Sequence, residues 1–144
     1  MSNNRVKNPI KIMVFGTFDG LHLGHLHFLK QAKSLSKRGY LIVSVARDEN
    51  VEKIKGRSPF FGEKKRKKFI EKSKIADKVV LGGVKNHLPH ILSAAPDIIA
   101  LGYDQKAYVK GLKKDLKEKK LSVKIVRLKP YKEKIYKSSL LNHP

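Results

Sequence analysis

The segment of residues 40–46 (YLIVSVA) constrains the fold most, because it is almost continuously apolar. A strand with one face in water alternates apolar and polar side chains, whereas a strand covered on both faces reads as an unbroken apolar run. Residues 10–16 (IKIMVFG) and 96–101 (PDIIAL) are also rich in apolar side chains. These runs predict a parallel sheet with helices packed on both of its faces.

Helical segments separate the apolar runs along the whole chain. Between the first two runs, apolar residues recur at three-residue spacing and form a stripe along one side of a helix: Leu26, Leu29, Ala32 and Leu35. The pattern predicts strands at residues 10–16, 40–46, 77–81, 96–101 and 121–128, helices at 24–37, 63–74, 87–95 and 107–119, a loop at 47–62 and a polar tail at 129–144. This alternation is typical of a doubly wound α/β fold. We expect one Rossmann-like domain over residues 1–144 with a five-stranded parallel sheet, and flexible ends at 1–9 and 140–144.

The chain is strongly basic, with 33 Lys and Arg against 12 Asp and Glu and a formal net charge of +21. Most of these cations are lysines, and they are spread evenly along the sequence. Proteins that bind nucleic acid usually concentrate their charge in a patch and favour arginine. The even spread therefore disfavours nucleic acid as the partner, and it leaves open a compositional habit or an attraction to small anionic ligands.

Several classes of protein are disfavoured by what the sequence lacks. It has no cysteine, which excludes disulfides and thiolate metal sites. No apolar run approaches the about 20 residues of a membrane span. The first nine residues are polar and lack the apolar core of a signal peptide. We expect a cytoplasmic protein that does not bind membranes.

The sequence GTFDGLHLGH follows the first expected strand, and parallel sheets bind ligands at the carboxyl ends of their strands. It matches neither the dinucleotide fingerprint nor the P-loop. Gly16, Gly20 and Gly24 allow the backbone to approach a ligand closely. His22 and His25 lie three residues apart at the start of a helix, which places both imidazoles on one face. Together with the free N–H groups of the helix, they predict a phosphate site.

Two other interpretations of this histidine pair are open. The imidazoles can serve only to cap the helix, which would give them a structural role. They can also be two ligands of a metal ion, although no third ligand of obvious type lies near them in the sequence.

The HLGH segment at residues 22–25 resembles the HxGH motif of the cytidylyltransferase-like nucleotidyltransferases. Further segments at residues 45–49, 55–57, 63–66 and 96–105 are most similar to archaeal-type FAD synthases, so that the resemblance covers nearly the whole chain. It implies that a phosphate oxygen of an acceptor attacks the α-phosphate of a nucleoside triphosphate in line and expels pyrophosphate. It also implies a divalent metal ion, with Mg²⁺ expected, and a homodimer, for which Phe60, Phe61 and residues 79–81 are candidate contacts.

The resemblance assigns roles to particular residues. The catalytic group is His22, His25, Lys55 and Arg57. The nucleotide-binding group is Gly16, Thr17, Phe18, His22, Gly24, His25, Arg66, Gly102, Asp104, Ser138 and Ser139. The acceptor-binding group is Lys55, Arg57, Phe60 and Phe61. Asp19 is expected to form a turn and structural hydrogen bonds, and Asp104 is as readily a helix-entry residue as a ribose ligand.

Three functions remain open on the sequence alone. The first is an adenylyltransferase that joins ATP and FMN to give FAD, and the pair Phe60 and Phe61 favours it by offering an aromatic slot for a flavin. The second is a transferase that uses CTP with glycerol 3-phosphate or a phosphorylated amino alcohol. The third is a basic module without catalytic activity that binds nucleic acid through its net charge.

Overall fold

The computed structural model describes residues 8–83, 88–103, 105 and 109–130. Strands and helices alternate through these residues, in the order β1 (Ile10–Gly16), α1 (Leu23–Lys33), β2 (Gly39–Val45), α2 (Asp48–Lys55), α3 (Glu63–Ser73), β3 (Lys78–Leu81), α4 (Leu88–Ala94), β4 (Ile98–Leu101), α5 (Val109–Glu118) and β5 (Lys124–Arg127). None of the helices in this part of the chain is long and apolar enough to span a membrane.

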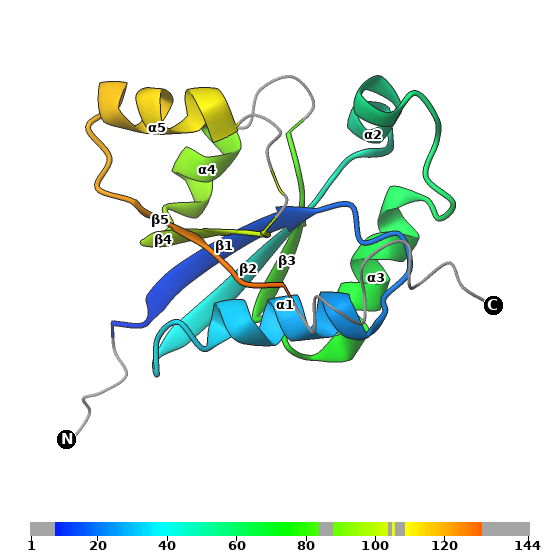
Figure 1. Ribbon diagram of the computed structural model, residues 1–144, viewed down its shortest axis with the longest axis horizontal. Helices are drawn as coiled ribbons and strands as arrows, with labels where there is room; N and C mark the ends of the chain where they lie inside the picture. Colours follow the sequence, from blue (N-terminus) through cyan, green and yellow to red (C-terminus); the bar gives the residue numbers. More distant parts are fainter. Residues whose placement is uncertain (1–7, 84–87, 104, 106–108, 131–144) are drawn as a thin grey trace.

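The five strands form one parallel sheet in the order β3-β2-β1-β4-β5. The chain moves outward from β1 through β2 to β3, and it then returns to the other side of β1 to add β4 and β5 (Figure 1). The direction of winding thus reverses between β1 and β4. This topology confirms the predicted doubly wound fold.

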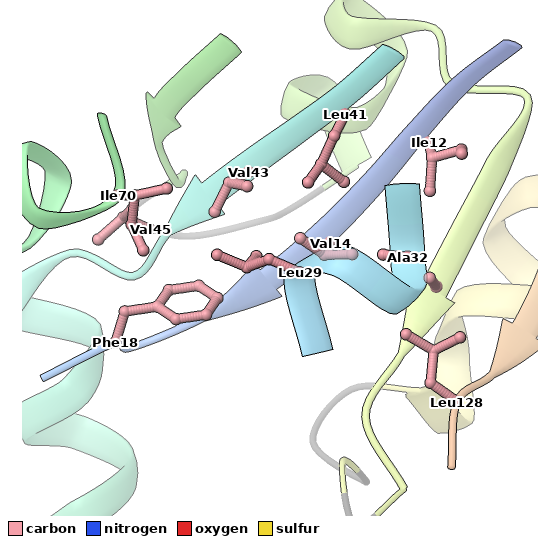
Figure 2. Packing of buried hydrophobic residues seen from close by; sticks show 11 residues of the cluster. Ile12, Val14, Phe18, Leu29, Ala32, Leu41, Val43, Val45, Ile70 and Leu128 are labelled. Carbon is pink, nitrogen blue, oxygen red and sulfur yellow. The ribbon is translucent and has the colours of Figure 1, made fainter. Parts of the chain in front are cut away.

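Helices cover both faces of the sheet and create two apolar cores. α1 and α3 lie on one face, while α4 and α5 lie on the other (Figure 1). Neighbouring residues of β1 point to opposite sides, so that Val14 packs with Leu29 of α1 and Ile70 of α3, whereas Met13 packs with Ile91 of α4. Figure 2 shows the first of these cores. The double burial explains why the strands read as continuous apolar runs.

The expected loop at residues 47–62 is wrong, because its first part forms α2. Asp48 and Glu49 occupy the first turn, where negative charge is favoured by the helix dipole. Gly56 ends the helix in the left-handed conformation at φ 73°, and Val51 anchors it in the core. An eight-residue helix with one buried residue has too little apolar periodicity to stand out among the surrounding lysines.

Candidate active site

The topology places the ligand crevice at the carboxyl ends of β1 and β4. In a doubly wound sheet, ligands bind where the strand order reverses, because the connections on either side lead away in opposite directions. β1 runs into the loop that precedes α1, and β4 runs into a turn that contains Gly102, Tyr103 and Gln105. These two segments form the walls of the candidate site.

His22 and His25 cap the amino-terminal end of α1 for each other. Nδ1 of His22 accepts the backbone N–H groups of Gly24 at 3.0 Å and His25 at 3.4 Å. Nδ1 of His25 accepts the backbone N–H of His22 at 3.4 Å, which completes a capping box. Because both Nδ1 atoms are acceptors, the proton of each neutral imidazole lies on Nε2. Capping and phosphate binding are therefore compatible for His22, since the cap leaves its Nε2–H as a donor, whereas the N–H of His25 is engaged by the backbone of Gly20.

The two imidazoles stack, with ring centroids 3.8 Å apart and planes inclined by 23°. Burial lowers the pKa of His25 to about 4, and nearby His22 and the charge of Lys55 act in the same direction. A hydrogen bond with the backbone of Gly20 opposes this shift. His25 is consequently neutral near pH 7 and offers a hydrogen bond rather than a full positive charge.

Two glycines of the motif make room for rings of the same loop. A Cβ on Gly24 would lie 2.9 Å from Cε1 of His22, and a Cβ on Gly16 would lie 2.7 Å from the ring of Phe18. Phe18 itself has a positive φ of 52° and is buried in the core beside α1 (Figure 2). Its ring meets the imidazole of His25 edge to face at 5.5 Å between centroids. Gly16 is thus required by the packing of the buried Phe18 ring, and Gly24 by the position of the His22 imidazole, which the sequence did not reveal.

Arg66 is fully buried and joins three segments at the carboxyl end of the sheet. Its Nη1 donates to the carbonyls of Thr17 at 2.9 Å and Ala46 at 2.8 Å. Its Nε donates to the carbonyl of Phe61 at 2.8 Å, and Nη2 forms an ion pair with Asp48 at 2.6 Å. The expectation that Arg66 binds the nucleotide does not fit this geometry, because the guanidinium is enclosed and engaged by the protein. Arg66 instead positions the loops around the site.

Asp19 holds the loop that follows α2. Its carboxylate accepts the backbone N–H of Phe60 at 2.6 Å and that of Phe61 at 2.8 Å. Burial acts to raise the pKa of Asp19, but the two N–H groups and the positive charges of Arg66 and Lys55 lower it below its ordinary value. These contacts confirm the prediction that Asp19 forms structural hydrogen bonds.

Phe60 and Phe61 have different surroundings. The ring of Phe61 is half-buried between Phe60 and Phe69, with perpendicular contacts at centroid distances of 4.8 and 4.9 Å, and the ammonium of Lys65 lies 5.3 Å from it. Phe60 is 85% exposed and offers the open ring. Lys55 is also exposed, and its effect on the pKa values of His25 and Asp19 places it near both groups.

Arg57 is exposed in the loop after α2, and no salt bridge is formed by Lys55 or Arg57 within the described part of the chain. Three predicted residues lie outside the described residues: Asp104, Ser138 and Ser139. Among the residues that are described, no group of three His, Asp or Glu side chains is placed to hold a metal ion. Mg²⁺ is commonly held by one or two carboxylates together with substrate phosphates, so that the ion expected from the resemblance does not require such a group.

Sequence reasoning missed two residues that shape the second wall. The side chains of Gln105 and Arg127 hydrogen-bond to the backbone of the turn after β4. The scarcity of arginine in a lysine-rich chain was the available signal for Arg127, but the edge-strand pattern around it explained the residue equally well.

Comparison with known proteins agrees with this architecture. Residues 13–141 match the cytidylyltransferase-like family. An FAD synthase of Korarchaeum cryptofilum is 46% identical over 119 residues, which are 82% of this chain and 80% of that protein. An FAD synthase of Thermococcus sibiricus is 41% identical over 92% of this chain and 90% of its own.

A solved structure is also similar over most of both chains. It is the crystal structure of a Thermoplasma volcanium protein described as a lipopolysaccharide core biosynthesis protein, with 39% identity and a TM-score of 0.78. The alignment covers 86% of this chain and 99% of that one. The family match extends through the strands, the histidine cap and the turn after β4, and the chain belongs to the cytidylyltransferase-like family.

Proposed function

We propose that this protein is an FAD synthase that transfers AMP from ATP to FMN. A phosphate oxygen of FMN forms a bond to the α-phosphorus of ATP while the bond from that phosphorus to the oxygen bridging to the β-phosphate breaks. The products are FAD and pyrophosphate. The observation that carries the proposal is the 46% and 41% identity with two FAD synthases over most of each chain.

The histidine cap suits this reaction. The attacking phosphate oxygen is already anionic, so no general base is needed, and catalysis depends on positioning and on stabilising charge at the α-phosphate. His22 supplies an Nε2–H donor beside the amino-terminal end of α1, whose dipole favours anions, and the stacked ring of His25 supports it. Because the cap fixes the His22 ring before the substrate arrives, its donor needs no reorganisation during the reaction.

The acceptor side of the site has an aromatic surface. The exposed ring of Phe60 is held in place through its own backbone by Asp19, and Arg66 holds the neighbouring carbonyl of Phe61. A flavin ring is flat and apolar and gains from such a surface, whereas a three-carbon phosphate needs only polar contacts. Lys55 is exposed and its positive charge acts on His25, which supports a role for Lys55 in attracting the phosphates.

Four further parts of the proposal stand as predictions. Mg²⁺ enters with the phosphates of ATP, and it supplies charge neutralisation there when bound. Arg57 contacts phosphates of donor or acceptor. The protein forms a homodimer and acts in the cytoplasm.

The test is a product assay with matched histidine variants. Purified protein with Mg²⁺ receives FMN or glycerol 3-phosphate, each with ATP or CTP, and nucleotide products and pyrophosphate are quantified by chromatography. FAD is expected only from ATP with FMN, and His22→Ala is expected to abolish it while circular dichroism shows the fold intact. His27→Ala on the same helix is the control and should retain activity. A CDP-linked product, or salt-sensitive nucleic-acid binding that survives His22→Ala without turnover, would overturn the proposal.

A further inference from the structure

The turn after β4 is the second wall of the ligand crevice. β4 pairs directly with β1 through Ile12 with Ile98 and Met13 with Ile99, so that the two strand ends are neighbours in the sheet. The first wall carries the histidine cap and the helix terminus that suit phosphates. If phosphates bind at the first wall, the nucleoside half of the same ligand reaches the second wall, which lies beside it at the switch point of the sheet. Tyr103 in this turn is 46% exposed and offers an aromatic face.

Gln105 closes this turn and ties it to β1. The backbone N–H of Gln105 donates to the carbonyl of Gly102 at 3.1 Å, which makes the turn. Its side-chain oxygen accepts the N–H of Gly102 at 3.1 Å, and its side-chain nitrogen donates to the carbonyl of Phe15 at 3.1 Å. One amide thus satisfies backbone groups on both walls of the crevice.

Arg127, the last residue of β5, holds the same turn from the other side. Its Nη1 donates to the carbonyls of Gly102 at 2.8 Å and Gln105 at 3.0 Å, and the carbonyl of Tyr103 lies at 3.4 Å. Three carbonyl dipoles thus converge on one guanidinium nitrogen. A lysine ammonium at this position would end one bond short of Nη1 and would present a point charge instead of a planar fork.

We propose that Gln105 and Arg127 are positioning residues that hold the backbone of Gly102, Tyr103 and Gln105 in the conformation that receives the nucleoside of the nucleotide substrate. They act through the backbone of the turn and not by touching the reacting atoms. The inference rests on the proposed function for the identity of the nucleotide, whereas the contacts of Gln105 and Arg127 with the turn are hydrogen bonds of the structure itself. On this proposal, the loop before α1 governs the chemical step and the turn after β4 governs nucleotide affinity.

The experiment compares variants of Gln105 and Arg127 with the wild type. Affinity for α,β-methylene-ATP is measured by calorimetry, and KM for ATP, KM for FMN and kcat are measured by FAD formation. Arg127→Ala should raise the dissociation constant of the analogue and KM for ATP about tenfold, equal to about 1.4 kcal/mol. The value of kcat and the KM for FMN should stay within about twofold, as expected for a loss of uniform binding.

Two further variants separate geometry from charge and from general stability. Arg127→Lys keeps the charge and should behave like Arg127→Ala, while Gln105→Ala should raise KM for ATP in the same way. Lys124→Ala removes an exposed cation from the start of the same strand and should match the wild type. Thermal unfolding is recorded for each variant, so that a loss of affinity is compared at a temperature where all are folded.

Several results would overturn the inference. These are an unchanged analogue affinity in Arg127→Ala together with a lower melting temperature, a wild-type affinity in Arg127→Lys, or a fall in kcat with KM for ATP unchanged. If the wild type forms no FAD but Arg127→Ala still weakens binding of the ATP analogue about tenfold, the proposed function fails and this inference stands.

Discussion

Replacing Gly24 by Ala should separate the stability of the protein from its activity. A Cβ at this position would lie 2.9 Å from Cε1 and 3.1 Å from Nδ1 of His22, which is closer than carbon atoms pack, so the imidazole must move. The ring then loses the bonds by which Nδ1 accepts the N–H groups of Gly24 and His25. Loss of an N-cap costs about 1 kcal/mol. Alanine in place of glycine within a helix stabilises the folded protein by about 1 kcal/mol.

These two terms nearly cancel, so the melting temperature of Gly24→Ala should lie within about 4 °C of the wild type. Activity should not be preserved, because the displaced Nε2–H of His22 no longer points at its target. Removal of one preorganised donor costs about 100-fold in kcat or more. Gly24→Ala should therefore resemble His22→Ala in FAD formation, although the imidazole is still present.

Thermal unfolding and steady-state FAD formation on the same preparations check this prediction. Lys30→Ala, on the exposed side of α1, is the control for a helix-favouring substitution that leaves the cap intact. If Gly24→Ala keeps kcat within about threefold of the wild type, the position of the His22 ring does not matter and the role given to the cap is wrong.

Three other changes test the supports of the site. The pKa of His25 is about 4 in the folded protein against an ordinary value of 6.5, so the unfolded chain takes up a proton first as the pH falls. Stability should therefore decline from about pH 6.5 toward pH 4, and urea unfolding of His25→Gln should show a flatter dependence. Asp19→Asn weakens the hold on Phe60 and Phe61 and should raise KM for FMN about fivefold, with affinity for the ATP analogue unchanged in calorimetry. Arg66→Met removes a buried cation and leaves its carbonyl partners without a donor, so the free energy of unfolding measured with denaturant should fall by about 3 kcal/mol. A fall of less than about 1 kcal/mol contradicts the role given to Arg66.

The sequence was sufficient for the architecture because its strands are buried twice. Met13 and Val14 are neighbours in the sequence but pack into different cores, on opposite faces of the sheet. Because both faces are buried, successive residues of the strand must be apolar, and the sequence shows an unbroken apolar run. The start of α1 was also predictable, because the spacing of Leu26, Leu29 and Ala32 placed the first helical residue near 24, one position from its observed start at Leu23. The sequence did not reveal that the Nδ1 atoms of His22 and His25 do the capping, because cap and ligand contact use different nitrogens of one ring.

The supporting residues could not be predicted for a different reason. Arg66 reaches a carbonyl 49 positions earlier, at Thr17, and Gln105 reaches one 90 positions earlier, at Phe15. Backbone carbonyls occur at every residue and leave no mark in the sequence, so nothing identifies the partner of such a side chain. Arg66 was expected to bind the nucleotide, because the carbonyls of Thr17 and Ala46 that enclose it are invisible in the sequence.

The supports also determine how salt should act on this enzyme. Arg66 is enclosed and His25 is neutral near pH 7, so neither of them brings a free positive charge to the reacting phosphate, and the end of α1 contributes its dipole. The formal net charge of +21 lies elsewhere and attracts the anionic substrates through the field of the whole surface. Raising the ionic strength from about 0.05 to about 0.5 M screens that field and should increase KM for ATP several-fold, while kcat stays nearly constant. A parallel fall in kcat would mean that exposed cations such as Lys55 stabilise the transition state themselves. The histidine cap would then make the smaller contribution to catalysis.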